Sequence, residues 1–201
     1  MKNSTTATVP IPTPTPTPTT STTMATTDQI FQTLKELTIP FIKSQCVLHK
    51  HEILICGGYD QNSCYSYHKI KNEYKFICDF PNDVILWGHC VVKLVYNNKD
   101  SNQVNLLCFG GHFKHTLIMK YVRVCDNLSK ENNQNKWTPF TDNNNIIKIE
   151  KDSNNYYVVL AVLGGINNNL LFITYYPHCI IVFDLNTYQF IKDDNLPIKR
   201  Q

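Results

Sequence analysis

The stretch "ILICGGYD" (Ile53–Asp60) places four apolar residues directly before two adjacent glycines, in a chain that has only 7 glycines among 201 residues. The same order returns in "LLCFGGHF" (Leu106–Phe113) and in "LAVLGGIN" (Leu160–Asn167). A short apolar run that is bounded by glycine is typical of a buried strand. Because glycine has no Cβ, it lets a strand end turn sharply where another segment of backbone lies close. A glycine pair that returns about every 50 residues therefore predicts a fold of repeated β units.

A second repeat marks the end of each unit. The segments "NEYKFICDFP" (Asn72–Pro81) and "NTYQFIKDDNLP" (Asn186–Pro197) share an Asn, a Tyr, a Phe and an Ile at the same spacing. Between them, "NKWTPFTD" (Asn135–Asp142) supplies Trp137 as the corresponding aromatic residue. From Phe31 onward, short apolar runs alternate with turn signals, and no segment keeps a helical period for three turns. This pattern predicts short antiparallel strands that are joined by hairpins.

In this order of motifs the sequence resembles the kelch repeats. The unit of that family is a four-stranded blade, in which the second strand ends in Gly-Gly, the third carries a Tyr and the fourth begins with a Trp or another large aromatic residue. The first unit fits with "EILICGG", "CYSYHKIKN" and "EYKFICDFP", and the second with "GHCVVKLVY", "VNLLCFGG", "TLIMKYVRV" and "KWTPF". The resemblance covers about Leu37–Pro197 and assigns the structural motif to Gly57, Gly58, Gly110, Gly111, Tyr67, Tyr74, Tyr121, Trp137 and Tyr188. Tyr74, Trp137 and Tyr188 are expected to begin the fourth strands and to lie mostly buried.

The third unit departs from the pattern. If Gly164-Gly165 ended its second strand, the residues that follow would have to form one very long strand, which Pro177 and His178 interrupt. The preferred interpretation makes "YYVVLAV", "LLFITYY", "IIVFDLN" and "YQFIKDD" the four strands. Gly164-Gly165 is then a hairpin turn, and Tyr175-Tyr176 stands where the other units have the glycine pair.

The resemblance implies an all-β fold, a kelch-type β-propeller fragment of about three four-stranded antiparallel blades. The blades are expected over residues 41–83, over 84–145 with Asn-rich insertions, and, in degenerate form, over 146–197. Because propellers close with about four to eight blades, we expect the chain to be the N-terminal part of a ring. Residues 28–40, which include "FQTLKELTIP", are a candidate closing strand of a missing last blade, and a short helix over Phe31–Leu37 is the alternative.

Residues 1–27 form a Thr/Pro-rich tail that contains "VPIPTPTPTPTTSTT" (Val9–Thr23). The prolines favour an extended polyproline II conformation and the segment has little apolar surface to bury, so the sequence predicts disorder. The tail is either a solvated appendage or a phosphorylation target, because Thr13, Thr15 and Thr17 each precede a proline.

Composition argues against several classes of protein. The net charge of +3 comes without a Lys/Arg-rich stripe, so we expect no nucleic-acid partner. No uninterrupted apolar run reaches the roughly 20 residues that a membrane helix needs, and no segment resembles a signal peptide. The 8 cysteines form no CxxC pair, and several stand in apolar runs as small apolar residues would. These features favour a soluble cytoplasmic protein without a disulfide framework.

Residues that could carry chemistry do not form a recognisable site. The pairs His49/His51 and His112/His115 are expected in exposed loops, and neither has the further ligands that zinc needs. The "GHC" and "PHC" stretches place His beside Cys, but adjacent residues on a strand point to opposite faces and cannot form a nucleophile–base pair. We therefore expect no catalytic residues, no cofactor and no metal site.

The function that the resemblance implies is non-catalytic protein–protein interaction through the loops between strands. Rigid blades hold such loops at one surface. The candidate partner-binding residues are Tyr59, Asp60, Gln61, His112, Phe113, Lys114, His115, Pro177 and His178, with Asn82-Asp83 and Asp142–Asn145 between blades. The end faces of the blade arc, with Leu171, Ile173, Ile181 and Phe183, suggest homo-association. A galactose-oxidase-like propeller enzyme and a truncated fragment without independent function are the alternatives.

Overall fold

The computed structural model describes residues 34–95, 103–124 and 135–197. The chain divides into two units, Met1–Leu34 and Lys35–Gln201, and the account below concerns the second. The tail over residues 1–27 and its candidate phosphorylation sites lie outside the described residues, as do residues 28–33 of the candidate closing strand. Across the described ranges there are strands but no helix, and so no helix of the length and apolarity that crossing a membrane requires.

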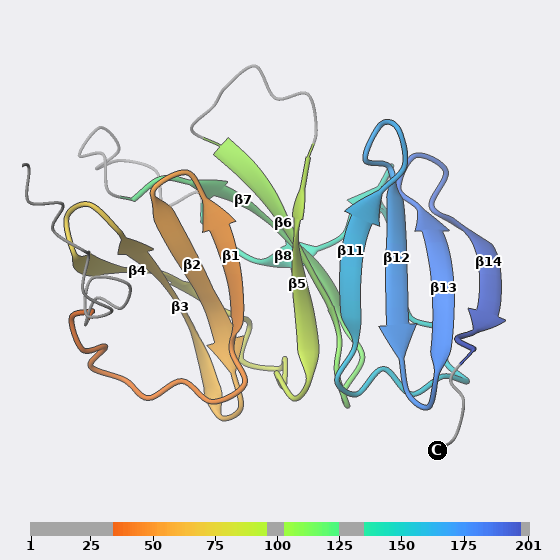
Figure 1. The fold of residues 1–201 in the computed structure, drawn as a ribbon, viewed down its shortest axis with the longest axis horizontal. Helices are drawn as coiled ribbons and strands as arrows, with labels where there is room; N and C mark the ends of the chain where they lie inside the picture. The colour runs from red at the N-terminus through yellow and green to blue at the C-terminus, as the bar shows by residue number, and fades with distance from the viewer. Residues whose placement is uncertain (1–33, 96–102, 125–134, 198–201) are drawn as a thin grey trace, which may run out of the picture. The chain divides into compact units, whose positions relative to one another are not determined.

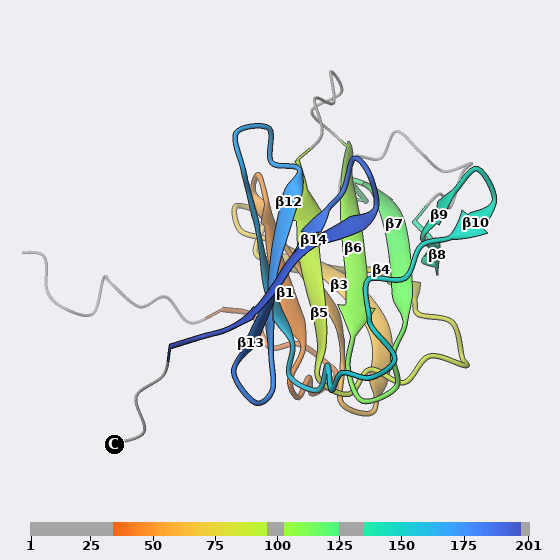
Figure 2. The same ribbon diagram turned by 90° about the vertical axis from the view of Figure 1, so that its right-hand side faces the viewer.

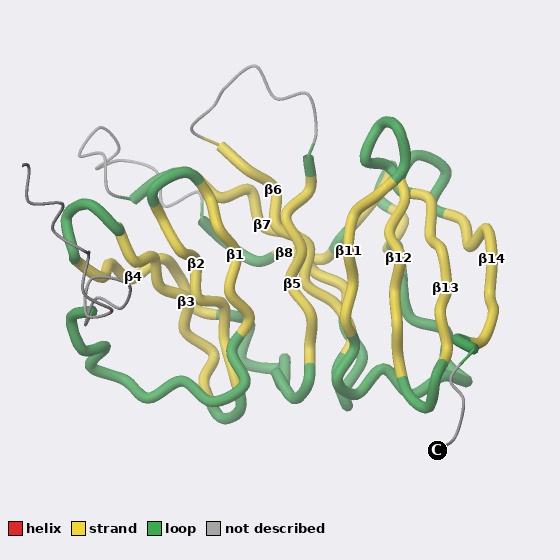
Figure 3. Tube along the Cα trace, viewed as in Figure 1, coloured by secondary structure: helices red, strands yellow, loops and turns green. Residues whose placement is uncertain are grey.

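Three four-stranded antiparallel sheets, each in chain order, make up the structure (Figures 1 and 3). The first contains β1 (Gln45–His49), β2 (Glu52–Gly58), β3 (Gln61–His68) and β4 (Glu73–Asp79). The second contains β5 (His89–Leu94), β6 (Gln103–Gly110), β7 (Thr116–Val122) and β8 (Thr138–Pro139). The third contains β11 (Leu160–Gly164), β12 (Leu170–Tyr175), β13 (Cys179–Asp184) and β14 (Gln189–Asn195). The predicted all-β architecture of four-stranded antiparallel sheets is confirmed.

A small hairpin of β9 (Thr141–Asp142) and β10 (Asn145–Ile146) follows the second sheet. Figure 2 shows this hairpin beside β7 and β8. Its turn residues Asn143 and Asn144 have φ values of 46° and 70°, as a two-residue type I′ turn requires. The Asn-rich stretch "TDNNN" is therefore a tight hairpin, because Asn tolerates the left-handed conformation better than most residues.

The third sheet has the predicted strand order, and Gly164-Gly165 belongs to the turn of the β11–β12 hairpin. Gly164 is the last β11 residue and pairs with Leu170, and Gly165 turns the chain with a φ of 81°. The largest difference from the predicted boundaries is in β11, which begins at Leu160 and not at Tyr156. Tyr156 is fully buried and its carbonyl accepts a hydrogen bond from Gly111 N–H (3.0 Å), so this segment is tied to the second sheet.

The described part of the candidate closing strand, residues 34–40, forms neither a strand nor a helix. Its backbone is attached to the β3–β4 turn of the first sheet, where Lys35 N–H donates to Asn72 Oδ1 (3.2 Å). Directly after this segment, the Phe41 ring packs edge-on against Tyr65 of the first sheet with 5.9 Å between ring centroids.

Two apolar cores lie between the sheets, and the middle sheet is buried on both faces. Alternate residues of β6 point to opposite faces, so Leu106 and Cys108 belong to the core shared with the first sheet. Leu107 and Phe109 belong to the core shared with the third sheet. Face-to-face burial on this scale is the main stabilising contribution in such a fold, at roughly 25 cal/mol per Å² of apolar surface.

The prediction that four third-sheet residues form an uncovered end face was wrong. Each of them is almost fully buried in the core against the second sheet: Leu171, Ile173, Ile181 and Phe183. The reason is the alternation along β12 and β13, which turns these odd-numbered positions inward. The opposite face carries the even-numbered positions, among them Phe172, Ile180 and Val182.

The aromatic residues of the structural motif are not equivalent. Trp137 is 1% exposed and stacks on Phe80 with 4.5 Å between ring centroids, as the sequence predicts. Tyr74 and Tyr188 are only half-buried, which corrects the expectation that they are mostly buried. Tyr74 lies on the face of the first sheet that points away from the second sheet. Tyr188 precedes β14 and packs edge-on against Phe140.

The tyrosines in the third strands are both buried. The Tyr67 hydroxyl donates to Asn72 Oδ1 (2.9 Å) in the β3–β4 turn. The Tyr121 hydroxyl donates to Glu52 Oε2 (3.1 Å) and so joins the second sheet to the first. Arg123 Nε lies 3.3 Å from the same carboxylate oxygen, which offsets part of the cost of burying that charge.

Candidate functional site

The two glycine pairs build the same local structure twice. A Cβ on Gly58 would lie 2.6 Å from the Ile42 carbonyl oxygen, and one on Gly111 would lie 2.9 Å from the Trp87 carbonyl oxygen. The residue after each pair donates its backbone N–H to that same oxygen, at 2.8 Å from Tyr59 and at 2.9 Å from His112. The segment that enters each sheet is thereby held against the end of that sheet's second strand.

The first glycine of each pair makes room for the segment that enters the following sheet. A Cβ on Gly57 would lie 2.2 Å from a Leu86 methyl group, and one on Gly110 would lie 2.4 Å from a Val159 methyl group. Both glycines have a positive φ, +53° and +81°, which residues other than glycine rarely adopt. The repeated glycines therefore fix how consecutive sheets join.

Three loops lie at the end of the sheets where the second strands finish, which is the lower edge in Figure 1. They are the β2–β3 turn at Tyr59 and Asp60, the β6–β7 loop over 111–115, and the β12–β13 turn over 176–178. Because β2, β6 and β12 run in the same direction, their loops lie on the same side. The segments that precede β5 and β11 arrive at the same end.

An aromatic cluster fills this end, made of Tyr59, Trp87, His112, Phe113 and Tyr157. The Trp87 ring is central, at 5.6 Å from Tyr59, 5.3 Å from His112 and 5.7 Å from Tyr157 between ring centroids. Phe113 extends it from His112 at 4.8 Å. The Trp87 indole N–H donates to the Tyr157 hydroxyl (3.2 Å). Tyr59 is 40% exposed and Phe113 is 48% exposed, so the cluster presents ring surface to solvent.

Lysine side chains border the cluster. Lys43 Nζ donates to the Tyr157 hydroxyl (3.4 Å) and lies 5.9 Å from the centre of that ring. This hydrogen bond, together with the one from Trp87, lowers the pKa of Tyr157 below its ordinary value. On the other side, Lys114 Nζ donates to the carbonyl oxygens of Lys151 (3.0 Å) and Asp152 (2.6 Å).

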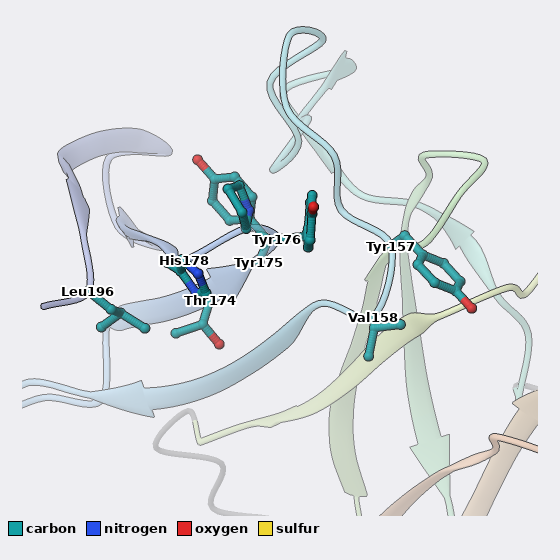
Figure 4. Close-up of a pocket in the computed structure, with 8 residues that line it drawn as sticks. Tyr157, Val158, Thr174, Tyr175, Tyr176, His178 and Leu196 are labelled. Atoms are coloured by element: carbon teal, nitrogen blue, oxygen red, sulfur yellow. The ribbon is translucent and has the colours of Figure 1, made fainter. Parts of the chain in front are cut away.

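An open pocket of about 390 Å³ continues the surface toward the third sheet. Tyr157 and Val158 lie on one side of it, and residues of the β12–β13 turn, with Tyr176 and His178, lie on the other (Figure 4). Tyr157 belongs both to this pocket and to the aromatic cluster. The predicted loop residues Pro177 and His178 are thereby joined to those of the other two loops.

A second pocket, of about 420 Å³, lies beside the β6–β7 loop. Asp83 and the candidate residues Phe113, Lys114 and His115 line it. The buried Glu150, also in its lining, accepts hydrogen bonds from Gly110 N–H (2.6 Å) and from the Thr116 hydroxyl (2.5 Å). This carboxylate ties the start of the loop to its end, and the sequence offered no pattern that marks it.

Two of the four histidines predicted in exposed loops are not exposed. His49 is 4% exposed, its ring lies edge-on to Tyr121 at 6.1 Å, and burial lowers its pKa. His115 is half-buried, with Nδ1–H donating to the Phe113 carbonyl (3.1 Å) and Nε2 3.3 Å from Cys108 Sγ. His51 and His112 are exposed as expected.

Three of the candidate loop residues lie in strands, because Asp142 belongs to β9 and Asn145 to β10. Gln61 is the first residue of β3 and pairs with Gly58, because the β2–β3 connection is a tight turn of Tyr59 and Asp60. Conversely, the sequence argument missed Trp87 and Tyr157. The one signal for Trp87 was a large aromatic residue in a connecting segment, immediately before "GHC". Tyr157 was assigned to the interior of a strand, where its role at a surface could not be recognised.

Within the described ranges, no group of three or more His, Cys, Asp or Glu side chains is placed to hold a metal ion. The same ranges contain five buried cysteines: Cys56, Cys64, Cys78, Cys90 and Cys108. Burial raises the pKa of Cys90 to about 11, and it also raises the pKa of Cys64 and of Cys108 well above the ordinary value. These thiols stay protonated at neutral pH and pack as small apolar groups.

No family model matches the chain, and no curated protein matches it either.

Proposed function

We propose that the chain is a kelch-type β-propeller module that binds a protein partner at the aromatic cluster and the loops around it, without catalysing a reaction. The observation that carries the proposal is the aromatic cluster itself. Residues from two loops and two connecting segments, far apart in sequence, present adjoining rings at one end of rigid sheets.

The propeller-type architecture is supported by the way the sheets follow one another. Each sheet is antiparallel and in chain order, and its first strand contacts the first strand of the next sheet, β1 with β5 and β5 with β11. A propeller places the first strand of each blade at the centre, around a channel. The equivalent surroundings of Gly58 and Gly111 support a repeat of the kelch type.

A protein partner suits this surface better than a small substrate. Trp and Tyr are enriched among the residues that dominate binding energy in protein interfaces. Their rings offer large contact area at a low cost in side-chain entropy. Here Tyr59 and Tyr157 hold the Trp87 ring from two sides, so little further ordering is required on binding.

The test is affinity capture from the organism's own extract with three forms of the full chain. A double variant, Tyr59→Ala with Phe113→Ala, removes exposed rings without opening a core. Ile70→Ala is the matched control, because Ile70 is 71% exposed in the β3–β4 turn at the other end of its sheet. We expect a protein that the wild-type chain and the control retain and that the double variant loses. Identical sets of captured proteins for all three forms would contradict the proposal.

A further inference from the structure

Within the described residues, no second sheet packs on one of the two faces of the first sheet. This face is here called the first outer face. Residues that pair directly across strands share a face. Two such rows define it, and they consist of Leu48, Ile53, Tyr67 and Tyr74, and of Cys46, Ile55, Tyr65 and Phe76. Leu48 is 57% exposed and Phe76 is 50% exposed. Tyr67 is 4% exposed, and Phe41 of the same chain packs edge-on against Tyr65. This apolar and aromatic face is therefore covered in part and is open to solvent at Leu48 and Phe76.

The third sheet has the corresponding face on its other side, here called the third outer face. Its two rows consist of Val162, Phe172, Val182 and Lys192, and of Leu160, Thr174, Ile180 and Asp194. Val162 is 65% exposed and Leu160 is 60% exposed. Within these two rows the charged residues are Lys192 and Asp194 of β14, which form an ion pair (3.1 Å). An apolar centre with a polar edge is the usual composition of a protein interface.

These two faces are of complementary kinds. The middle sheet uses one face to pack on the sheet before it and the other to pack on the sheet after it. The first outer face corresponds to the face of the middle sheet that packs on the sheet before it. The third outer face corresponds to the face of the middle sheet that packs on the sheet after it. The two sheet–sheet interfaces inside the chain therefore show how a first outer face and a third outer face can join.

The first strands of the three sheets also line one shallow open groove, of about 350 Å³. Its lining comes from β1, β5 and β11, and it includes both Leu48 and Val162. These two residues, which belong to opposite outer faces, thus border the same central surface. A ring of sheets around that surface would bury both.

We propose that two copies of this chain associate head to tail and close a ring of six sheets, three from each copy. The first outer face of each copy packs on the third outer face of the other. Six sheets fall within the range of about four to eight at which propellers close, and three copies would exceed it. A contact between two different faces gives a closed assembly when the rotation returns to its start, and here two identical contacts complete it.

This inference rests on the propeller-type architecture of the proposed function but not on partner binding at the aromatic cluster. The residues of the two outer faces are distinct from those of the cluster. A chain that dimerises without capturing a partner would overturn only the proposed binding role, and a monomeric chain that captures one would overturn only the ring.

The first experiment is the mass of the full chain in solution, by sedimentation. We expect the wild-type chain at twice its 23.2 kDa. Leu48→Lys and Val162→Glu alter opposite outer faces at exposed positions, and each should give a monomer, because every copy contributes both faces to the ring. Ile70→Lys, a charge placed on an equally exposed residue outside both faces, should remain a dimer. Circular dichroism and thermal unfolding verify that each variant is folded.

The second experiment mixes the two monomeric variants in equal amounts. In the mixed pair one contact joins two unaltered faces, and the other joins the face with Lys to the face with Glu. We therefore expect the dimer to return. If either single variant stays dimeric, the copies associate through like faces and the proposal is wrong. A wild-type chain that is monomeric, or that forms polymers of increasing length, also overturns the closed ring.

A third measurement needs no substitution. Cys46 lies on the first outer face and is exposed in the single chain. Alkylation of Cys46, followed by peptide mass spectrometry, should slow as protein concentration rises and the dimer covers this thiol. A rate that does not depend on concentration would contradict the proposed contact.

Discussion

At the scale of single residues, close contacts decide which positions of the repeat are constrained. Gly110 and Gly111 combine a positive φ with neighbours that leave no space for a Cβ. Trp137 is equally constrained for the opposite reason, because it fills the core between the first two sheets and its indole N–H donates to Cys64 Sγ (3.4 Å). Backbone and side-chain packing thus both specify this fold at individual positions.

Trp137→Ala should lower the free energy of unfolding by about 3–5 kcal/mol, because it leaves a large cavity in a fully buried site. Tyr74→Ala is the matched comparison, since Tyr74 occupies the same position in the repeat but is half-buried. We expect a clearly smaller loss for it. Urea denaturation of the three proteins measures both. Equal losses would mean that the fourth-strand aromatic residues have one common role.

Gly111→Ala should destabilise the chain more than Gly165→Ala does. Both glycines have a strongly positive φ, +90° and +81°, so the backbone cost of alanine is similar. At Gly111 the new Cβ would also meet the Trp87 carbonyl oxygen at 2.9 Å, whereas at Gly165 its nearest neighbour is the Leu170 side chain at 3.0 Å. A side chain can move away more easily than backbone. Thermal unfolding that ranks the two variants in the reverse order would contradict this account.

At the scale of elements, the sequence predicted strands well where its signals are local. The bounds of β2 follow directly from "EILICGG" (Glu52–Gly58), and the hairpins follow from Gly, Asp and Asn at turns. It failed where a long-range contact decides. Tyr156 lies outside β11, the strand in which it was predicted, because its carbonyl is hydrogen-bonded to the second sheet. Trp87 belongs to the aromatic cluster because its ring contacts three rings from distant parts of the chain. The local pattern of apolar residues in the sequence does not indicate such long-range contacts.

A buried histidine makes the contact between the first two sheets sensitive to acid. His89 is 1% exposed, its Nε2–H donates to the Cys56 carbonyl (3.2 Å), and burial lowers its pKa to about 4 from the ordinary 6.5. The unfolded chain therefore binds the proton more readily than the folded chain does. Stability should be lost as the pH falls from 6.5 toward 4, by up to about 3 kcal/mol from this residue.

The measurement is the free energy of unfolding at several pH values for the wild-type chain and for His89→Gln, which keeps a polar group but cannot take up this proton. The difference between the two proteins removes the contribution of the carboxylates. We expect that difference to change between pH 6.5 and pH 4 and to be constant above. A difference that is constant throughout the range would show that His89 does not titrate as described.

At the scale of the whole molecule, the three sheets depend on one another because the middle sheet is covered on both faces. The sequence indicated the repeat and the strands within it, but it could not say which face of each sheet is covered. Leu171 and Ile173 were expected at an open end and lie in the core, since the choice between odd and even positions depends on which neighbour each strand meets.

Thiol reactivity tests this burial across both cores. In the native chain the five buried cysteines should not react with a thiol reagent at pH 8, since their thiols are inaccessible to it. Cys46 should react at protein concentrations that keep the chain monomeric, and denaturant should expose the five buried cysteines together if the sheets unfold as one unit. Peptide mapping assigns each site. Early reaction of Cys90 or Cys108 would mean that the second and third sheets separate in the native state.

The most direct test of the central claim, that the loop end of the sheets binds a partner, is hydrogen exchange of the chain with and without the captured protein. Bound partner should slow exchange in the β2–β3 turn, in residues 111–115 and around Tyr157. The β1–β2 and β3–β4 turns, at Lys50-His51 and at residues 69–72, lie at the other end of the first sheet and should exchange unchanged. Protection of those turns, with the aromatic cluster unaffected, would contradict the account.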